Sequence, residues 1–263
     1  MSNWVVVLLG IVEGITEFLP VSSTGHLLLV ENGLRLTIHP SELFNVVIQC
    51  GAVLAVLLAF SERLRQMWAN RSTPDVRSYV FKLGIAFSTT VIGALLLKKL
   101  DWELPENPAP VAWATLIGGG VILLLEWLKR DRPNARAEAL PWTVALAVGL
   151  SQVVAAAFPG TSRSGASILM AMAMGVGRPA AIEFSFLLGV PTLLAAGAYT
   201  ALSAIRHPKP MEPLGQILLG TVVAAITAFI AVRWLLKYVQ SHTLVPFGWY
   251  RVVLGVVILI ALR

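Results

Sequence analysis

The sequence predicts an all-α integral membrane protein with about six transmembrane helices and two broken re-entrant helical hairpins. The first observation is composition, because 57% of the residues are hydrophobic, 13% are charged and the mean hydropathy is +0.77, well outside the range of soluble domains. The second is a series of apolar segments long enough to cross a bilayer. The third is a pair of apolar regions interrupted by polar, proline-containing stretches. We expect residues 1–263 to form a single membrane domain.

Charge and cysteine content exclude several other classes of protein. Basic residues in the short loops of a membrane protein explain the net charge of +6, so no nucleic-acid partner is expected. Cys50 is the single cysteine and lies in an apolar run, so we interpret it as a packed side chain. No Lys or Arg precedes Arg35 and no cleavage site follows a short apolar core, so the first segment is expected to remain in place.

Six segments approach the roughly 20 apolar residues that a ~30 Å hydrocarbon core requires. They are residues 43–60, 79–98, 109–128, 181–204, 214–236 and 246–262. Two further apolar regions, 4–30 and 141–177, are interrupted by FLPVSSTGH and FPGTSRSG. We expect each region to enter the bilayer, break at Pro20 or Pro159, and return as a second short helix. Broken backbone at membrane depth must be buried in protein or line a polar cavity, so both breaks predict a cavity.

The loops between the spans predict a topology. Residues 61–82 carry five basic residues and residues 129–138 carry four, so both loops are expected on the cytoplasmic side. The loop KKLDWELPENPAP between them offsets two lysines with three acids, as expected for the outer side. The first broken region therefore enters from outside and the second from the cytoplasm.

The two halves of the chain, residues 1–130 and 139–263, are predicted to be inverted repeats. A shift of 139 residues places Gly10 on Gly149, Pro20 on Pro159 and Ser23 on Ser162, and Glu13 falls on Gln152. Each half contains one broken hairpin and three spans, and an odd number of spans inverts the second copy. Inverted repeats place their broken elements face to face near the midplane.

Two carboxylates lie in the first broken region. Glu13 and Glu17 are four residues apart, which puts both on one face of a helix. A carboxylate in a bilayer costs about 2.5 to 3.5 kcal/mol on insertion scales, so we expect an ion, a proton or a basic partner. A structural pair with buried donors is the alternative.

Hydroxyl groups and a histidine follow the proline of the first break. Ser22, Ser23 and Thr24 are good helix-capping residues, and His26 lies in the first turn of the helix that they start. Such an N-terminus offers free amide donors and a positive dipole, which together favour an anion. The alternative is that these side chains only cap the helix.

The second break adds an arginine to another helix start. PGTSRSG places Arg163 among Thr161, Ser162 and Ser164, and its planar, permanently charged group suits phosphate. The alternative is a salt bridge to one of the two acids, which does not exclude a phosphate bound by the same arginine. The remaining polar residues rank lower: Asn45, Gln49 and Glu183 near the starts of spans are candidates to line the cavity, and His39, His207 and His242 in loops are expected to be solvated.

Together these groups are the components of metal-assisted phosphoryl transfer. The acids can hold a divalent cation, the hydroxyls and imidazole can attack or move protons, and the guanidinium can stabilise phosphoryl charge. A hydrolase that acts on a phosphorylated lipid is therefore the physical hypothesis.

The segments EGITEFLPVSSTGH (13–26) and PGTSRSG (159–165) resemble the two signatures of the undecaprenyl-diphosphate phosphatase family of bacterial inner membranes, also called the bacitracin-resistance family. The similarity in length and segment pattern covers essentially the whole chain. The resemblance implies hydrolysis of undecaprenyl diphosphate to undecaprenyl phosphate and inorganic phosphate, which recycles the lipid carrier for cell-wall glycan synthesis. It also implies a divalent cation, Mg²⁺ or Ca²⁺, and an active site that opens to the periplasmic face.

The resemblance assigns roles position by position. Glu17, Ser23, His26 and Arg163 would be catalytic, and Glu13 and Glu17 would be the metal ligands. The substrate-binding set would be Ser22, Thr24, Gly25, Thr161, Ser162, Ser164 and Gly165. In the preferred mechanism Ser23 attacks the terminal phosphorus while His26 moves the proton. His26 itself or a metal-bound water are the alternative nucleophiles.

A carrier is the competing class of function, because inverted repeats with broken helices are also a transporter architecture. The same charged residues would then move a lipid phosphate across the bilayer without cutting it. The expected partners are a polyprenyl diphosphate and the membrane lipid. The sequence neither requires nor excludes a homo-oligomer.

Overall fold

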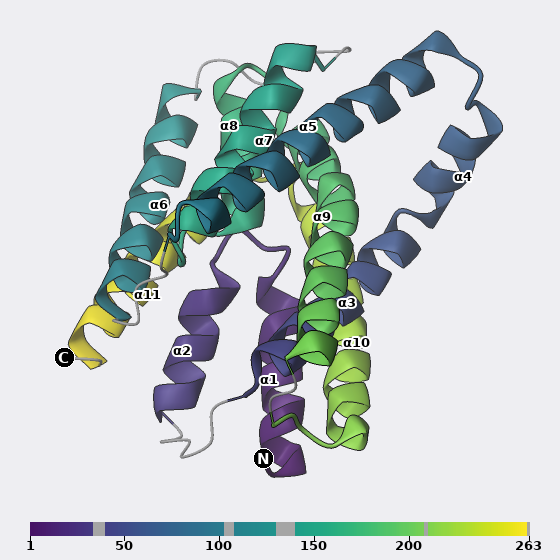
Figure 1. The fold of residues 1–263 in the computed structure, drawn as a ribbon. Helices are drawn as coiled ribbons and strands as arrows, with labels where there is room; N and C mark the ends of the chain where they lie inside the picture. The colour runs from purple at the N-terminus through teal and green to yellow at the C-terminus, as the bar shows by residue number, and fades with distance from the viewer. Residues whose placement is uncertain (34–39, 103–107, 130–139, 208–209, 262–263) are drawn as a thin grey trace.

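The computed structural model describes residues 1–33, 40–102, 108–129, 140–207 and 210–261 of the chain. These residues form eleven helices and no strand, so the predicted all-α class is confirmed (Figure 1). Five of the helices are long and apolar enough to cross a membrane: α3 (Glu42–Ala59), α5 (Pro74–Lys99), α6 (Pro108–Leu128), α9 (Arg178–Arg206) and α10 (Leu214–Tyr238). The sixth predicted span forms α11 (Val245–Ala261), which at 17 residues is shorter than these five. The protein is a multi-pass membrane protein.

Both predicted broken regions form pairs of short helices. The first pair is α1 (Asn3–Thr16) and α2 (Ser23–Gly33), and the second is α7 (Trp142–Ala157) and α8 (Arg163–Ala173). In each pair the residue before the second helix has a positive φ, which is 73° at Ser22 and 69° at Ser162. This conformation is rare outside glycine, and here it turns the chain sharply into the returning helix.

The prediction of a loop over residues 61–82 was wrong in part. Residues Ser61–Ala69 form α4, and α5 begins at Pro74, before the apolar run starts. The helix α4 is polar and has no buried residue, so hydropathy did not reveal it. Pro74 in the first turn of α5, together with Asp75, starts that helix early because both favour a helix N-terminus.

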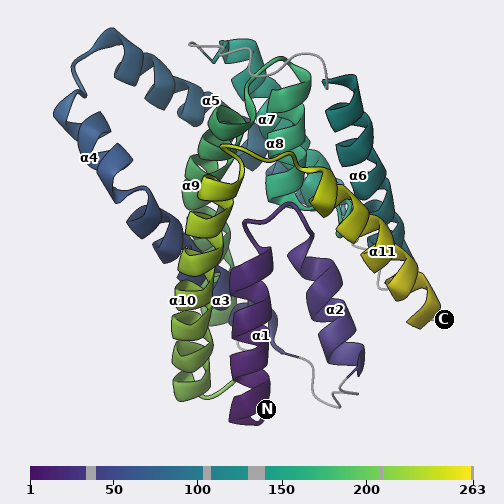
Figure 2. The ribbon, with the colours of Figure 1, turned by 180° about the vertical axis from the view of Figure 1, so that it is seen from behind.

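The two hairpins point at each other from opposite ends of the molecule. In Figure 1, α1 and α2 occupy the lower half and α7 and α8 the upper half, with their turns facing each other near the middle. The reverse view in Figure 2 shows the same arrangement. This arrangement brings the two polar breaks to one level of the molecule.

Packing around the hairpins follows the same pattern in both halves. The first helix of each hairpin packs on a long helix from the other half, α1 on α10 and α7 on α5. Repeat-related glycines permit both approaches: a Cβ at Gly10 would lie 2.8 Å from the carbonyl oxygen of Gly220, and one at Gly149 would lie 2.7 Å from that of Ala86. This pairing supports the inverted repeat of residues 1–130 and 139–263, which stays a prediction.

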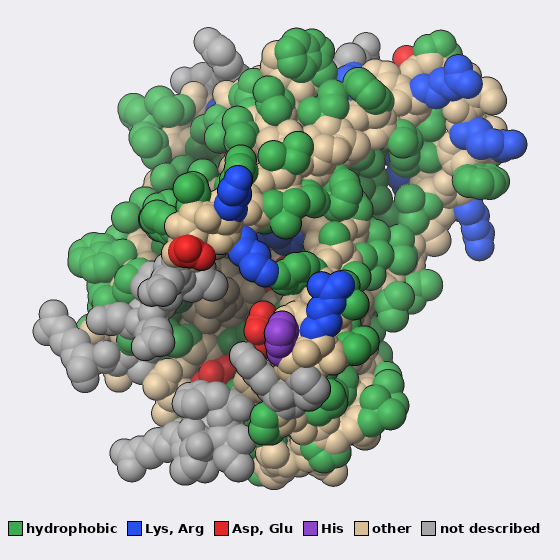
Figure 3. Space-filling model, viewed as in Figure 1, with side chains coloured by type: hydrophobic (Ala, Val, Ile, Leu, Met, Phe, Trp, Pro, Cys, Tyr) green, Lys and Arg blue, Asp and Glu red, His purple; other side chains and the backbone are tan. Residues whose placement is uncertain are grey.

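Charged groups gather in two places on the face that Figure 3 shows, one over α4 and the start of α5 and one near the middle of the face. Hydrophobic side chains cover most of the face in Figure 3, and basic side chains gather over α4 and the start of α5. The C-terminal end of α6 and the N-terminal end of α7 lie at the same end of the molecule as the α4–α5 turn (Figure 1). The α4–α5 turn and the ends of α6 and α7 therefore lie at one end of the molecule. The topology itself stays a prediction.

A buried ion pair ties three helices together near this end. Arg178 at the start of α9 donates to both carboxylate oxygens of Glu126 on α6, from Nε at 2.7 Å and from Nη2. The backbone N–H of Leu244, just before α11, donates to the same carboxylate at 3.0 Å. The Glu126 side chain is only 1% exposed, so its charge depends on these donors.

We therefore expect Glu126→Ala to lower the free energy of unfolding by about 3 kcal/mol, because it leaves a partly buried guanidinium and a buried backbone amide without their acceptor. Thermal melting of the detergent-solubilised protein measures the loss. Glu62→Ala on exposed α4 is the control and should melt with the unsubstituted protein. Equal melting temperatures for the two variants would contradict a stabilising role for this pair.

Candidate active site

The site is built where the turns of the two hairpins touch. The hydroxyl of Ser164 on α8 donates to the carbonyl oxygen of Leu19 at 3.1 Å. Arg163, the first residue of α8, donates from Nη2 to Oε1 of Glu17 at 3.0 Å. Residues about 145 positions apart in the chain thus share hydrogen bonds, and the structure brings the two predicted breaks together.

Glu17 is the central group of this contact. Its Oε1 accepts from Arg163, and its Oε2 accepts from the hydroxyl of Ser23 at 2.8 Å. The Glu17 side chain is 8% exposed, so solvent screens these contacts poorly. One carboxylate therefore connects a hydroxyl on the first hairpin with a guanidinium on the second.

The guanidinium of Arg163 is held from a third direction by α9. Its Nη1 donates to the hydroxyl of Thr192 at 2.8 Å and to the carbonyl oxygen of Gly189 at 3.3 Å. Gly189 leaves room for this group, because a Cβ there would lie 3.2 Å from Nη1. The buried Nε has no hydrogen-bond partner among the described residues, so one donor of the guanidinium is left for another acceptor.

Glu13 lies one turn before Glu17 and is fully buried. Neither of its carboxylate oxygens has a hydrogen-bond partner among the described residues. Buried, unpartnered carboxylate oxygens are the ligands that hard divalent cations take, and Mg²⁺ is commonly held by one or two carboxylates together with substrate phosphates. Among the described residues, no three His, Cys, Asp or Glu side chains lie close enough together to hold a metal ion, so a cation here would need ligands beyond the two acids. Glu13 offers two unpartnered oxygens to such a site, whereas both oxygens of Glu17 already accept hydrogen bonds, and the cation stays a prediction.

His26 points to α11 rather than to Ser23. Its Nδ1 lies 2.7 Å from the carbonyl oxygen of Ser22, and its Nε2 lies 2.6 Å from the hydroxyl of Tyr250. The imidazole stacks on the Tyr250 ring with centroids 5.5 Å apart. No hydrogen bond joins this imidazole to Ser23 among the described residues, so the predicted proton shuttle is not in contact with the predicted nucleophile here.

Most of the predicted substrate-binding residues use their polar groups within the protein. The hydroxyls of Ser22 and Ser162 accept from the backbone N–H groups of Gly25 and Gly165, at 3.3 and 3.2 Å, and so cap α2 and α8. Ser164 is buried against the first break, as described above. The hydroxyl of Thr161 donates to the carbonyl oxygen of Phe158 at 2.7 Å. Thr24 is exposed and lies beside Ser23 in the first turn of α2.

Of the lower-ranked polar residues, Glu183 lies away from this contact. Glu183 accepts from Nε of Arg63 on α4 at 2.8 Å and lies 3.4 Å from the hydroxyl of Tyr79. It is therefore part of an ion pair at the α4 end and does not line the site. His207 and His242 are exposed, as predicted, and His39 lies outside the described residues. Asn45 and Gln49 lie on α3.

Two residues of α11 were missed by the sequence reasoning. Tyr250 contacts His26, and the fully buried Arg251 donates to carbonyl oxygens of both breaks. The signal for Arg251 was present, because an arginine inside an apolar span is expensive and needs partners. Nothing in the sequence singles out Tyr250 or Thr192.

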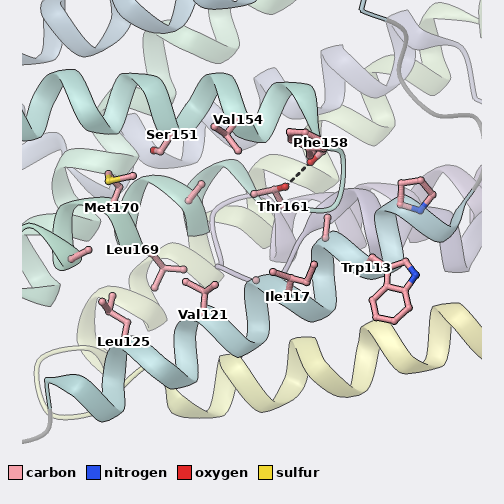
Figure 4. A pocket seen from close by; sticks show the side chains of 15 residues that line it. Trp113, Ile117, Val121, Leu125, Ser151, Val154, Phe158, Thr161, Leu169 and Met170 are labelled. Atoms are coloured by element: carbon pink, nitrogen blue, oxygen red, sulfur yellow. Dashed lines mark hydrogen bonds between the residues drawn. The ribbon is translucent and has the colours of Figure 1, made fainter.

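An apolar groove of about 600 Å³ lies beside the second break, between α6, α7 and α8. Figure 4 shows Ile117, Val121 and Leu169 lining it, with Thr161 where the groove meets the break. The two hydroxyl side chains in its wall, Ser151 and Thr161, both donate to backbone carbonyl oxygens. The groove thus presents an apolar wall, and Thr161, the wall residue in the second break, precedes Arg163 by two positions in the chain.

Comparison with known proteins assigns the chain to a family. The model of the family described as bacitracin resistance protein BacA matches residues 6–257. The chain belongs to the BacA family. A relative from Rhizobium etli is 46% identical over 254 residues, which cover 96% of this chain and 94% of the relative. One from Xylella fastidiosa is 44% identical over 254 residues, covering 96% and 95%. Both BacA-family relatives are named undecaprenyl-diphosphatase.

Proposed function

We propose that this BacA-family protein hydrolyses undecaprenyl diphosphate to undecaprenyl phosphate and inorganic phosphate. The observation that carries the proposal is the contact of Ser23, Glu17 and Arg163 across the two breaks. A hydroxyl that is hydrogen-bonded to a carboxylate, beside a partly buried guanidinium, is suited to attack on phosphorus. The names of the relatives supply the substrate. Recycling of this lipid carrier for cell-wall glycan synthesis, and resistance to bacitracin, follow from the same activity.

We place the protein in the bacterial inner membrane with the site open to the periplasmic face. The support is the segment of residues 61–82, which carries five basic residues and holds the α4–α5 turn at the end of the molecule where α6 ends and α7 begins (Figure 1). Such segments stay in the cytoplasm. The hairpin of α1 and α2 then enters the membrane from the opposite, outer side, with its turn at the inner tip.

The substrate's two ends have separate places in this proposal. Arg163 and the first N–H groups of α8 bind the diphosphate, since a helix N-terminus and a guanidinium both favour phosphate oxygens. The first isoprene units lie in the groove lined by Ile117, Val121 and Leu169. Its volume is in the usual range of ligand pockets, and a wall made almost entirely of apolar side chains favours a hydrocarbon occupant.

The chain's own residues can perform the transfer in two steps. The oxygen of Ser23 forms a bond to the terminal phosphorus, and the bond from that phosphorus to the bridging oxygen breaks, so undecaprenyl phosphate leaves. Glu17 accepts the hydroxyl proton, because it already accepts the hydrogen bond of Ser23 at 2.8 Å. Water then cleaves the phosphoseryl bond, and Ser23 recovers a proton. A divalent cation held by Glu13 and Glu17 would neutralise negative charge on the phosphate oxygens.

A carrier remains the second candidate, because broken helices that meet in one site are found in transporters. The two functions separate in detergent, where no membrane exists to be crossed. Release of inorganic phosphate from solubilised undecaprenyl diphosphate by the purified protein supports the phosphatase. Binding of the lipid without phosphate release would favour the carrier.

In that assay Arg163→Lys should lose about 10² to 10³ in kcat, because an ammonium cannot reproduce the fork that contacts Glu17, Thr192 and a phosphate together. Arg233→Lys, on the exposed side of α10, is the matched control and should turn over normally. Near-normal turnover in Arg163→Lys would remove this residue from the phosphoryl site.

Removal of divalent cations should abolish phosphate release, and Glu13→Gln should behave in the same way. The amide keeps the size of Glu13 and removes the charge that would hold a cation. Glu62→Gln on α4 is the control. An unsubstituted protein that stays active in excess chelator would show that the two acids serve other purposes, such as proton transfer and the pairing of Arg163.

The attacking group can be identified by acid-quench capture of labelled terminal phosphate. If Ser23 attacks, Ser23→Ala should retain no acid-stable label, whereas the neighbouring Ser22→Ala should retain it, because the Ser22 hydroxyl only caps α2. His26→Ala should still form the phosphoenzyme. Acid-stable label in Ser23→Ala would exclude this serine, and label that survives only an alkaline quench would move the attack to His26.

A further inference from the structure

Arg251 is a fully buried charged residue in the middle of apolar α11. Among the described residues, no carboxylate lies within salt-bridge distance of its guanidinium. A buried guanidinium has five N–H donors and accepts nothing, so it needs acceptors from elsewhere. All the acceptors that the structure gives it are backbone carbonyl oxygens.

These carbonyl oxygens belong to three separate parts of the chain. Two lie on α6 and two in the second break, and the longest contact reaches the first break. The donor–acceptor distances are 3.1 Å to Thr115, 3.2 Å to Ala114, 3.1 Å to Gly160, 3.0 Å to Thr161 and 3.5 Å to Pro20. Arg251 thereby fixes the second break against α6 and reaches the turn of the first hairpin.

The surroundings are shaped to hold this side chain. A Cβ at Gly165 would lie 3.1 Å from its Nη1, and a Cβ at Gly118 on α6 would overlap the guanidinium itself. Gly120 lies two positions after Gly118 on the same helix, and a Cβ added there would meet open space. The guanidinium of Arg251 therefore occupies the space that a side chain at Gly118 would fill.

We propose that Arg251 is a positioning residue for the phosphoryl transfer. It holds the carbonyl oxygens of Gly160 and Thr161, and so sets where the next turn of chain places Arg163 relative to Ser23 and Glu17. Arg251 acts through this backbone and contacts none of the reacting groups. The inference rests on the proposed phosphatase activity.

The sharpest test is a pair of alanine substitutions in α6 that leave Arg251 in place. Gly118→Ala should displace the guanidinium and lower kcat by about 10²-fold, the typical cost of a misplacement near 1 Å, with a smaller change in KM. Gly120→Ala adds the same methyl group two residues away and should turn over normally. Both solubilised variants should melt above the assay temperature. They are then folded during the assay, so a lower kcat cannot be ascribed to unfolding.

A second variant keeps the test decisive if Gly118→Ala does not fold. Arg251→Ala should lose kcat to a similar extent, and millimolar guanidinium ion should restore part of it by occupying the vacated site, whereas urea at the same concentration should not. Adding Gly118→Ala to Arg251→Ala should cause no further loss, because no guanidinium remains to be displaced.

The outcomes separate the two proposals. An unsubstituted protein that releases phosphate, with Gly118→Ala as fast as Gly120→Ala, overturns the positioning role and leaves the phosphatase intact. Variants of Arg251 that lower only the melting temperature, with full kcat and no effect of guanidinium ion, overturn it as well. An unsubstituted protein that releases no phosphate overturns the proposed function, and this inference with it.

Discussion

A backbone that leaves the helical conformation inside a bilayer must find hydrogen-bond partners within the protein, and this constraint organises the whole molecule. The chain breaks twice, after α1 and after α7, and each break finds partners in the opposite half. Ser164 of the second half donates to Leu19 in the first break, and Thr115 of the first half donates to Gly160 in the second break. Arg251, from the same half as the second break, donates to Gly160 and Thr161 as well. The bonds that make the breaks tolerable are thus the same bonds that assemble the site.

Charge follows the same logic. Glu13, Glu17, Arg163 and Arg251 are all largely removed from solvent, and an isolated charge there would be expensive. Two acids and two arginines balance formally, but only Glu17 and Arg163 form a direct pair. Glu13 has no hydrogen-bond partner among the described residues, and Arg251 has only carbonyl oxygens. The site therefore holds an acid without a hydrogen-bond partner among the described residues and an arginine without a carboxylate partner, an arrangement suited to an anionic substrate and a cation together.

The architecture also explains why a phosphatase would share features with carriers. Two hairpins that meet between long helices create a polar site, and the proposed function uses the apolar groove along α6, α7 and α8 as its route for lipid. A lipid whose reactive group is polar and whose tail is apolar needs both environments at once. Hydrolysis requires only that a nucleophile be held within this site, and Ser23 beside Glu17 meets that requirement.

The sequence by itself determined the helical membrane class, the two broken hairpins and the residues around which the site forms. These features are local, because hydropathy, prolines and helix-capping residues act over one or two turns. Tertiary structure decided how they combine. The Ser23–Glu17–Arg163 contact joins the start of α2, the end of α1 and the start of α8. No local sequence pattern predicts that these three side chains lie within hydrogen-bond distance. The orientation of His26 toward Tyr250, and the division of adjacent serines into a cap and a hydroxyl that donates to Glu17, depend on side-chain packing. The role of Arg251 exists only because α11 passes beside both breaks, so its acceptors lie on backbone from about 90 to more than 230 positions away in the chain.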